Sequence, residues 1–110
     1  MEVFVHHIYE YEKGIRNLVL HTSKENNVEF MVAKLEKRNI AYKIYKIGCG
    51  RVNVFFGSSE CVEVIEKIGK TALVDYTAEE DFLLGIMLGY DRRRQCERYL
   101  KLKEAPVKTA

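Results

Sequence analysis

The chain has 110 residues, of which 47% are hydrophobic and 31% charged, and its formal net charge at pH 7 is +2. This length fits a single domain over residues 1–110 with a core of its own, and the apolar content excludes an intrinsically disordered chain. A net charge this small does not by itself indicate nucleic-acid binding.

Several features favour a cytoplasmic protein. The first residues, MEVFVHH, have no basic segment followed by a long apolar one, so we expect no signal peptide. The uncharged run Phe82–Tyr90 is less than half of a bilayer span. The three cysteines, Cys49, Cys61 and Cys96, form no CxxC pair, and their odd number suits reduced thiols better than a disulfide framework.

The segment Val3–Lys13 fits two structures. Apolar and aromatic residues alternate as in a strand, whereas Phe4, Ile8 and Tyr11 recur at helical spacing. The following Gly14 is a favourable residue just after a helix, so we prefer a short helix here.

The next segments read as strand, helix and hairpin. Ile15–Thr22 predicts the first strand, and Ser23 is placed to cap a helix over Lys24–Arg38. Its apolar stripe is made of Val28, Met31, Val32 and Leu35. Ile40–Ile47 and Arg51–Gly57 then predict two strands, joined by a tight GCGR turn in which Gly48 and Gly50 take positive φ.

The second half of the chain reads as helices. Ser58 or Ser59 caps a helix that Gly69 ends. Thr77 and Glu80 match a capping box, which predicts a helix through Leu88 that Gly89 ends. Asp91 caps a last helix to about Lys103, and residues 104–110 are expected to form a flexible tail.

This order predicts an α+β fold with a three-stranded mixed sheet and about five helices around it, the helices covering one face. The connection from a strand through a helix to a parallel strand is expected to be right-handed. Such a small sheet leaves edges uncovered, which is one reason to expect a homodimer.

The stretch Phe82–Leu100, FLLGIMLGYDRRRQCERYL, is the most apolar run of the chain followed by the most basic one. Gly85 and Gly89 lie on one side of a helix that is apolar nearly all round, a pattern that lets another helix approach closely. We therefore predict a dimer interface made of Phe82, Gly85, Ile86 and Gly89. The alternative is a core helix with Gly89 as its terminal residue.

The basic run predicts a partner-binding surface made of Arg92, Arg93, Arg94 and Arg98. Such a surface suits an acidic protein, a phosphate group or RNA. The alternative is a solvated helix whose arginines pair with carboxylates of the same chain. For RNA the indication is weak, because no glycine-flanked aromatic motif lies on a strand.

No motif predicts a catalytic, cofactor or metal site. The histidines at 6, 7 and 21 and the cysteines lack metal-ligand spacing, and the GCG turn is not a phosphate loop. Cys96 lies among arginines that could lower its pKa, but a small inward-packing residue is the preferred interpretation. A small-ligand site or cysteine-based enzyme would need Cys49 or Cys96 to meet His6, His7 or Tyr90 in one polar pocket.

Three stretches together resemble a small bacterial family known only as a domain of unknown function. They are HHIYEYEKGIRNLVLHT (His6–Thr22), NVFFG (Asn53–Gly57) and EEDFLLGIMLGYDRRRQCERYL (Glu79–Leu100). The resemblance implies a homodimeric α+β protein of three strands and about five helices, commonly encoded beside flavodoxin, with no established activity or catalytic residue. Flavodoxins are acidic, so the basic helix has the right sign of charge to dock one.

The preferred hypothesis is thus a non-enzymatic cytoplasmic accessory protein that forms homodimers and docks an acidic redox partner such as flavodoxin, without a cofactor or membrane contact. The first alternative is a small-ligand-binding protein or cysteine-based enzyme. The second is an RNA-binding module.

Overall fold

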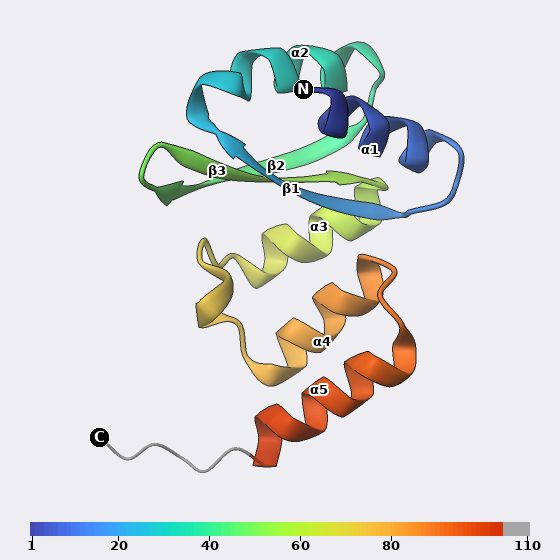
Figure 1. Ribbon diagram of the computed structural model, residues 1–110, viewed down its shortest axis with the longest axis vertical. Helices are drawn as coiled ribbons and strands as arrows, with labels where there is room; N and C mark the ends of the chain where they lie inside the picture. The colour runs from blue at the N-terminus through green and yellow to red at the C-terminus, as the bar shows by residue number, and fades with distance from the viewer. Residues whose placement is uncertain (105–110) are drawn as a thin grey trace.

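The computed structural model describes residues 1–104 (Figure 1). These residues form helices and strands in the following chain order: α1 (Glu2–Glu12), β1 (Leu18–Lys24), η1 (Glu25–Asn27), α2 (Val28–Lys37), β2 (Ala41–Gly48), β3 (Arg51–Gly57), α3 (Ser59–Ile68), η2 (Leu73–Asp75), α4 (Ala78–Met87) and α5 (Arg92–Glu104). The predicted α+β class is confirmed. Among the described residues, no helix has the length and apolar character needed to span a bilayer.

The three strands form one antiparallel sheet in the order β1-β3-β2. The prediction of a mixed sheet is wrong, because β3 lies between β1 and β2 and runs antiparallel to both. The turn between β2 and β3 explains this arrangement. Gly48, Cys49 and Gly50 have φ values of 91°, 53° and 70°, so the chain reverses within three residues and β3 returns beside β2.

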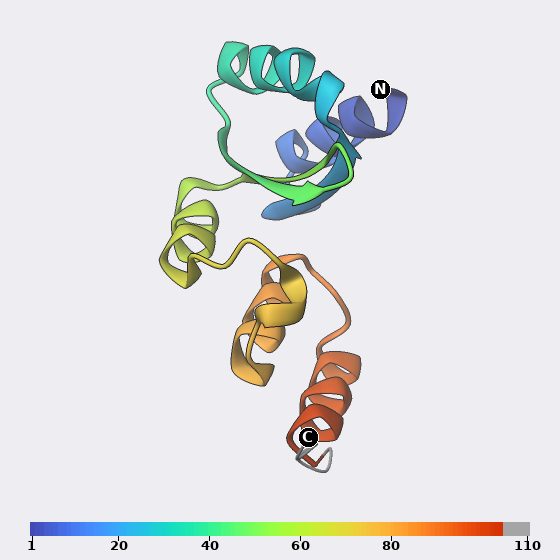
Figure 2. The same cartoon turned by 90° about the vertical axis from the view of Figure 1, so that its left-hand side faces the viewer.

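Helices cover both faces of the sheet, whereas the sequence predicted a cover on one face. Figures 1 and 2 show α1 and α2 on one side, α3 and α4 on the other, and α5 beyond α4. The reason lies in β3, where six of the seven residues are buried. Val52, Val54 and Phe56 pack beneath α1 and α2, and Phe55 packs against α3 and α4. A central strand that is apolar on both faces needs helices on both.

The first strand extends further than predicted and removes the expected helix cap. β1 begins at Leu18 and continues to Lys24, because Ser23 and Lys24 pair with Val52 and Arg51 of β3. Ser23 is therefore a strand residue, and its hydroxyl accepts a hydrogen bond from the Asn27 side chain at 2.9 Å. The chain then enters α2 through the short 3-10 turn η1.

Other helix ends follow the local signals in the sequence. Gly69 ends α3 with φ 67°, and Gly14 follows α1 with φ 77°. Asp91 caps α5, since its carboxylate accepts a hydrogen bond from the Arg94 backbone N–H at 2.9 Å. Glu104, placed in the predicted tail, is the last residue of α5, and the rest of that tail lies outside the described residues.

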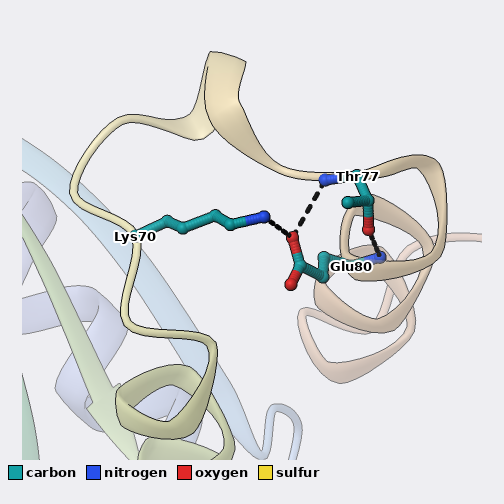
Figure 3. Close-up of polar contacts among 3 residues, drawn as sticks. All are labelled: Lys70, Thr77 and Glu80. Atoms are coloured by element: carbon teal, nitrogen blue, oxygen red, sulfur yellow. Dashed lines mark hydrogen bonds and ion pairs between the residues drawn. The ribbon is translucent and has the colours of Figure 1, made fainter.

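The capping box at the start of α4 is present, and a lysine extends it (Figure 3). The Glu80 N–H donates to the Thr77 hydroxyl at 3.1 Å, and the Thr77 N–H donates to the Glu80 carboxylate at 2.9 Å. Lys70 donates to the same carboxylate oxygen at 2.6 Å and comes from the loop after α3. The contact therefore ties the loop between α3 and α4 to the first turn of α4.

Candidate functional site

The candidate site is the helical hairpin formed by α4 and α5, residues 78–104, which we call the α4–α5 hairpin. Its turn is short and fixed at both ends. Gly89 follows α4 with φ 82°, a conformation that glycine adopts without strain, and Asp91 caps the first turn of α5. The second helix therefore folds back along the first and presents the basic segment next to the apolar one (Figure 1).

Gly85 is buried where the two helices meet. A Cβ atom on Gly85 would overlap the side chain of Gln95, whose Cγ would lie 3.1 Å away. Gln95 is in turn the residue of α5 that is buried. The missing side chain at position 85 thus lets α5 of the same chain approach α4 closely.

Gly89 has a different role. A Cβ atom at this position would meet no other atom within 4 Å, so its positive φ, and not close packing, explains the glycine. Both glycines are therefore accounted for within one chain. That a second copy also contacts them stays a prediction.

The outer side of the hairpin exposes large apolar side chains. Leu83 is 47% exposed, Ile86 39% and Leu100 55%. A groove of about 580 Å³ between the helices is lined by Glu79, Phe82, Leu83, Cys96, Tyr99 and Leu100. The Phe82 and Tyr99 rings meet edge to face across it, with centroids 5.7 Å apart. Two predicted interface residues belong to this outer side of the hairpin: Phe82 lines the groove and Ile86 is exposed.

Polar contacts join the two helices beside that groove. The Arg98 guanidinium donates two hydrogen bonds to Asp81, at 2.7 and 3.0 Å. Glu79 accepts a hydrogen bond from the Tyr99 hydroxyl at 2.8 Å and pairs with Lys103 at 3.0 Å. The bond from Lys103, and then that from Tyr99, lowers the pKa of Glu79. Most of these groups are well exposed, so each contact stabilises the hairpin only slightly.

These contacts separate the four predicted partner-binding arginines into two groups. Arg98 pairs with a carboxylate of its own chain, as the alternative interpretation predicted for the whole run. Arg92, Arg93 and Arg94 are exposed, and within residues 1–104 no carboxylate oxygen lies within 4.0 Å of their guanidinium groups. A shallow groove of about 470 Å³ runs along α5 past Arg94, Arg98 and Lys101. At the start of α5 the hairpin thus presents three cations that have no carboxylate partner within residues 1–104.

The cysteines and histidines of the ligand-binding or enzyme alternative lie on separate parts of the fold, while Tyr90 lies in the turn between α4 and α5. Cys49 is in the β2–β3 turn and Cys96 on α5, while His6 and His7 are on α1, across the sheet from α5 (Figure 1). The cavity that includes His6 contains no cysteine, and the groove that includes Cys96 contains no histidine. In the described part of the chain, no three His, Cys, Asp or Glu side chains are arranged to hold a metal ion.

His21 has the clearest change of environment among the histidines. Its ring lies 5.4 Å from that of Phe4 and 5.7 Å from that of His7, between β1 and α1. Burial, and then repulsion from His7, lowers the pKa of His21. His7 is hydrogen bonded to Glu10 at 3.1 Å. The pair therefore joins α1 to the sheet.

Sequence reasoning missed the residues that give the hairpin its shape. Leu83 and Leu100 carry much of its exposed apolar surface, and Asp81 and Glu79 hold α5 in place. Leu83 could have been found as a member of the apolar run Phe82–Leu88, whereas Leu100 lies beyond that run, on α5. The ion pairs could not, because which carboxylate meets which arginine depends on how the turn at Gly89 aligns the two helices.

Comparison with protein families decides the classification. A family model described as "Protein of unknown function (DUF2023)" matches residues 2–102. The chain belongs to this family. The match runs from α1 into the last turns of α5, so the DUF2023 pattern includes the sheet, both helical layers and the α4–α5 hairpin. No match is found among curated proteins.

Proposed function

We propose that this DUF2023 protein is a non-enzymatic cytoplasmic accessory protein that acts by binding other proteins. It forms a homodimer through the apolar outer side of the α4–α5 hairpin. It docks an acidic partner on Arg92, Arg93 and Arg94, with Arg98 at the border of that surface. The observation that carries the proposal is that one helical hairpin combines exposed apolar side chains with arginines that have no partner within residues 1–104.

The exposed apolar residues support self-association. Leu83 and Ile86 are one turn apart on α4, and Leu100 lies across the groove on α5. On the opposite side of α4, Leu84 and Leu88 pack into the core of the same chain. A helix with apolar residues on both sides gains free energy when a second surface covers the exposed side. A two-fold dimer would use this same surface on both copies.

The three arginines without a carboxylate partner in residues 1–104 support an acidic partner. Guanidinium groups form short, bidentate hydrogen bonds with carboxylates, and clustered positive charge speeds the encounter with an acidic protein. The family resemblance suggests flavodoxin as that partner. A docking surface of only a few arginines favours a weak or moderate complex, as is common between redox proteins.

Three free cysteines support a reducing compartment. Cys49, Cys61 and Cys96 are free in the described residues and lie in the β2–β3 turn, on α3 and on α5. Proteins that keep exposed thiols are typical of the cytosol, where disulfides rarely persist.

Binding to a flavodoxin at low and high salt tests the docking proposal. We expect binding at low salt that weakens by about tenfold or more in high salt, because the contact is ionic. The variant Arg92→Ala/Arg93→Ala/Arg94→Ala should lose this binding, and alanine keeps the helix favourable.

The matched control removes three exposed cations from other elements and carries the substitutions Lys37→Ala, Arg51→Ala and Lys67→Ala. It should bind like the unmodified protein. No binding at low salt contradicts the proposal, and so does an equal loss in both variants, which would indicate attraction to net charge alone.

A further inference from the structure

β1 is an edge strand without the features that normally prevent edge strands from pairing. It lies at one end of the sheet order β1-β3-β2. From Leu18 to Ser23 it has no charged residue and no proline, and its pairing with β3 shows no bulge. An uncharged, regular edge is a template for another strand.

The other edge strand, β2, is protected. Its pairing with β3 has a bulge between Lys46 and Gly48, and Lys43 and Lys46 add charge along it. Bulges and lysines are the usual means of blocking an edge. The contrast between the two edges singles out β1.

The register fixes which backbone groups of β1 face outward. The Ser58 N–H donates to the Asn17 carbonyl at 2.9 Å, and the Glu25 N–H donates to the Gly50 carbonyl at 2.7 Å. Both bonds extend the β1–β3 ladder at odd-numbered residues of the first strand. In an antiparallel ladder the bonded residues alternate, so the even-numbered residues direct their N–H and C=O groups away from β3.

These even-numbered residues are Leu18, Leu20, Thr22 and Lys24. Lys24 is also the N-cap of the 3-10 turn η1, so its C=O accepts the first hydrogen bond of that turn. Among the turn, loop and side-chain hydrogen bonds within residues 1–104, none satisfies the other outward backbone groups. The edge therefore presents four N–H groups and three free C=O groups in a row.

We propose that β1 pairs with β1 of a second copy of this chain, antiparallel and with the two-fold axis at His21, to form one continuous six-stranded sheet. In this register Leu18 lies opposite Lys24 of the partner, and Leu20 lies opposite Thr22. The free outward C=O groups are then all bonded, with about six hydrogen bonds between the two chains.

Charge explains why a second copy fits this edge. The single charged residue of β1, Lys24, meets an uncharged leucine in the proposed register, so no two cations face each other. If two copies instead paired through β2, Lys43 and Lys46 of the two chains would come close together. Backbone pairing buries less apolar surface than the hairpin contact, so it should require a higher protein concentration.

Hydrogen exchange tests the pairing, because it reports the outward N–H groups directly. The background variant is Ile86→Asp, which removes the proposed hairpin contact and leaves β1 unchanged. Between about 10 µM and about 1 mM protein, we expect the Leu20 and Thr22 amides to exchange about tenfold more slowly at the higher concentration. The Ser23 amide, already bonded to β3, serves as the internal reference.

Thr22→Pro in the same background should abolish this concentration dependence at Leu20. Proline removes an outward N–H while the β1–β3 bonds at residues 21 and 23 remain. Thr22→Ala is the matched control: it also loses the Thr22–Asn53 hydrogen bond of 2.6 Å but keeps the N–H, and it should behave like the background.

Fast, concentration-independent exchange at Leu20 and Thr22 overturns the proposal. A dependence that survives Thr22→Pro also overturns it, because the association would then use another surface. Since the hairpin contact is absent from every sample, the outcome is independent of the proposed function.

Discussion

The close contact between Gly85 and Gln95 makes a quantitative prediction about the α4–α5 hairpin. Gly85→Ala has two opposing effects on the free energy of unfolding. In a helix interior, alanine is favoured over glycine by about 1 kcal/mol. Here the new methyl group would overlap the Gln95 side chain, and such overpacking costs about 1–3 kcal/mol. The single substitution should therefore be neutral or destabilising by up to about 2 kcal/mol.

The sign should reverse when Gln95 is shortened. In a Gln95→Ala background the methyl group has room, so Gly85→Ala should stabilise by about 1 kcal/mol. The double-mutant cycle then gives a coupling free energy of about 1–3 kcal/mol. Urea unfolding of the four proteins measures it, with Gly89→Ala as a control that should show no coupling to Gln95.

An equal effect of Gly85→Ala in both backgrounds would refute the reasoning. If the same substitution instead changed the sedimentation of the protein without coupling to Gln95, the glycine would serve a contact between copies, as the sequence pattern first suggested.

Three further predictions concern stability. Thr77→Ala removes the side-chain cap of α4 and should lower the free energy of unfolding by about 1 kcal/mol, measured by urea titration. The hydrogen bond from Lys70, and then the one from the Thr77 N–H, lowers the pKa of Glu80 below 4.5. The ionised Glu80 carboxylate should therefore stabilise the fold at neutral pH, and this stabilisation should be lost as the pH falls through the folded pKa. Glu80→Gln should thus be less stable than the unmodified protein at pH 7, and the difference should shrink as the pH is lowered. Burial lowers the pKa of His21, so the unfolded chain binds the proton more readily than the folded protein does, and the free energy of unfolding should fall as the pH drops below about 6.5. In His21→Phe this pH dependence should be weaker. Unfolding curves recorded between pH 5 and pH 7.5 for both proteins measure the difference.

Local signals in the sequence predicted most elements of this fold. The capping box at Thr77, the glycine ends at Gly14 and Gly69 and the turn at Gly48–Gly50 each act within a few residues, so they can be read without the rest of the chain. The helix at residues 2–12 was also favoured correctly, although its alternation also fitted a strand.

What the sequence could not supply depends on contacts between distant segments. Ser23 has the chemistry of a helix cap, but pairing with Val52 keeps it in β1. The central position of β3 became clear only when both of its faces proved to be buried. At the candidate site, the sequence identified the basic run, but not that Asp81 binds Arg98 while the preceding arginines stay unpaired within the described chain.

Sedimentation velocity at micromolar concentration tests the central claim most directly, namely that the apolar outer side of the α4–α5 hairpin binds a second copy. The account predicts a dimer for the unmodified protein and a folded monomer for Ile86→Asp, because a carboxylate cannot be buried unpaired in the contact. Val3→Asp, which places the same charge at a 62% exposed position on α1, is the matched control and should remain a dimer. A monomeric unmodified protein, or a dimer that persists in Ile86→Asp, would contradict the account.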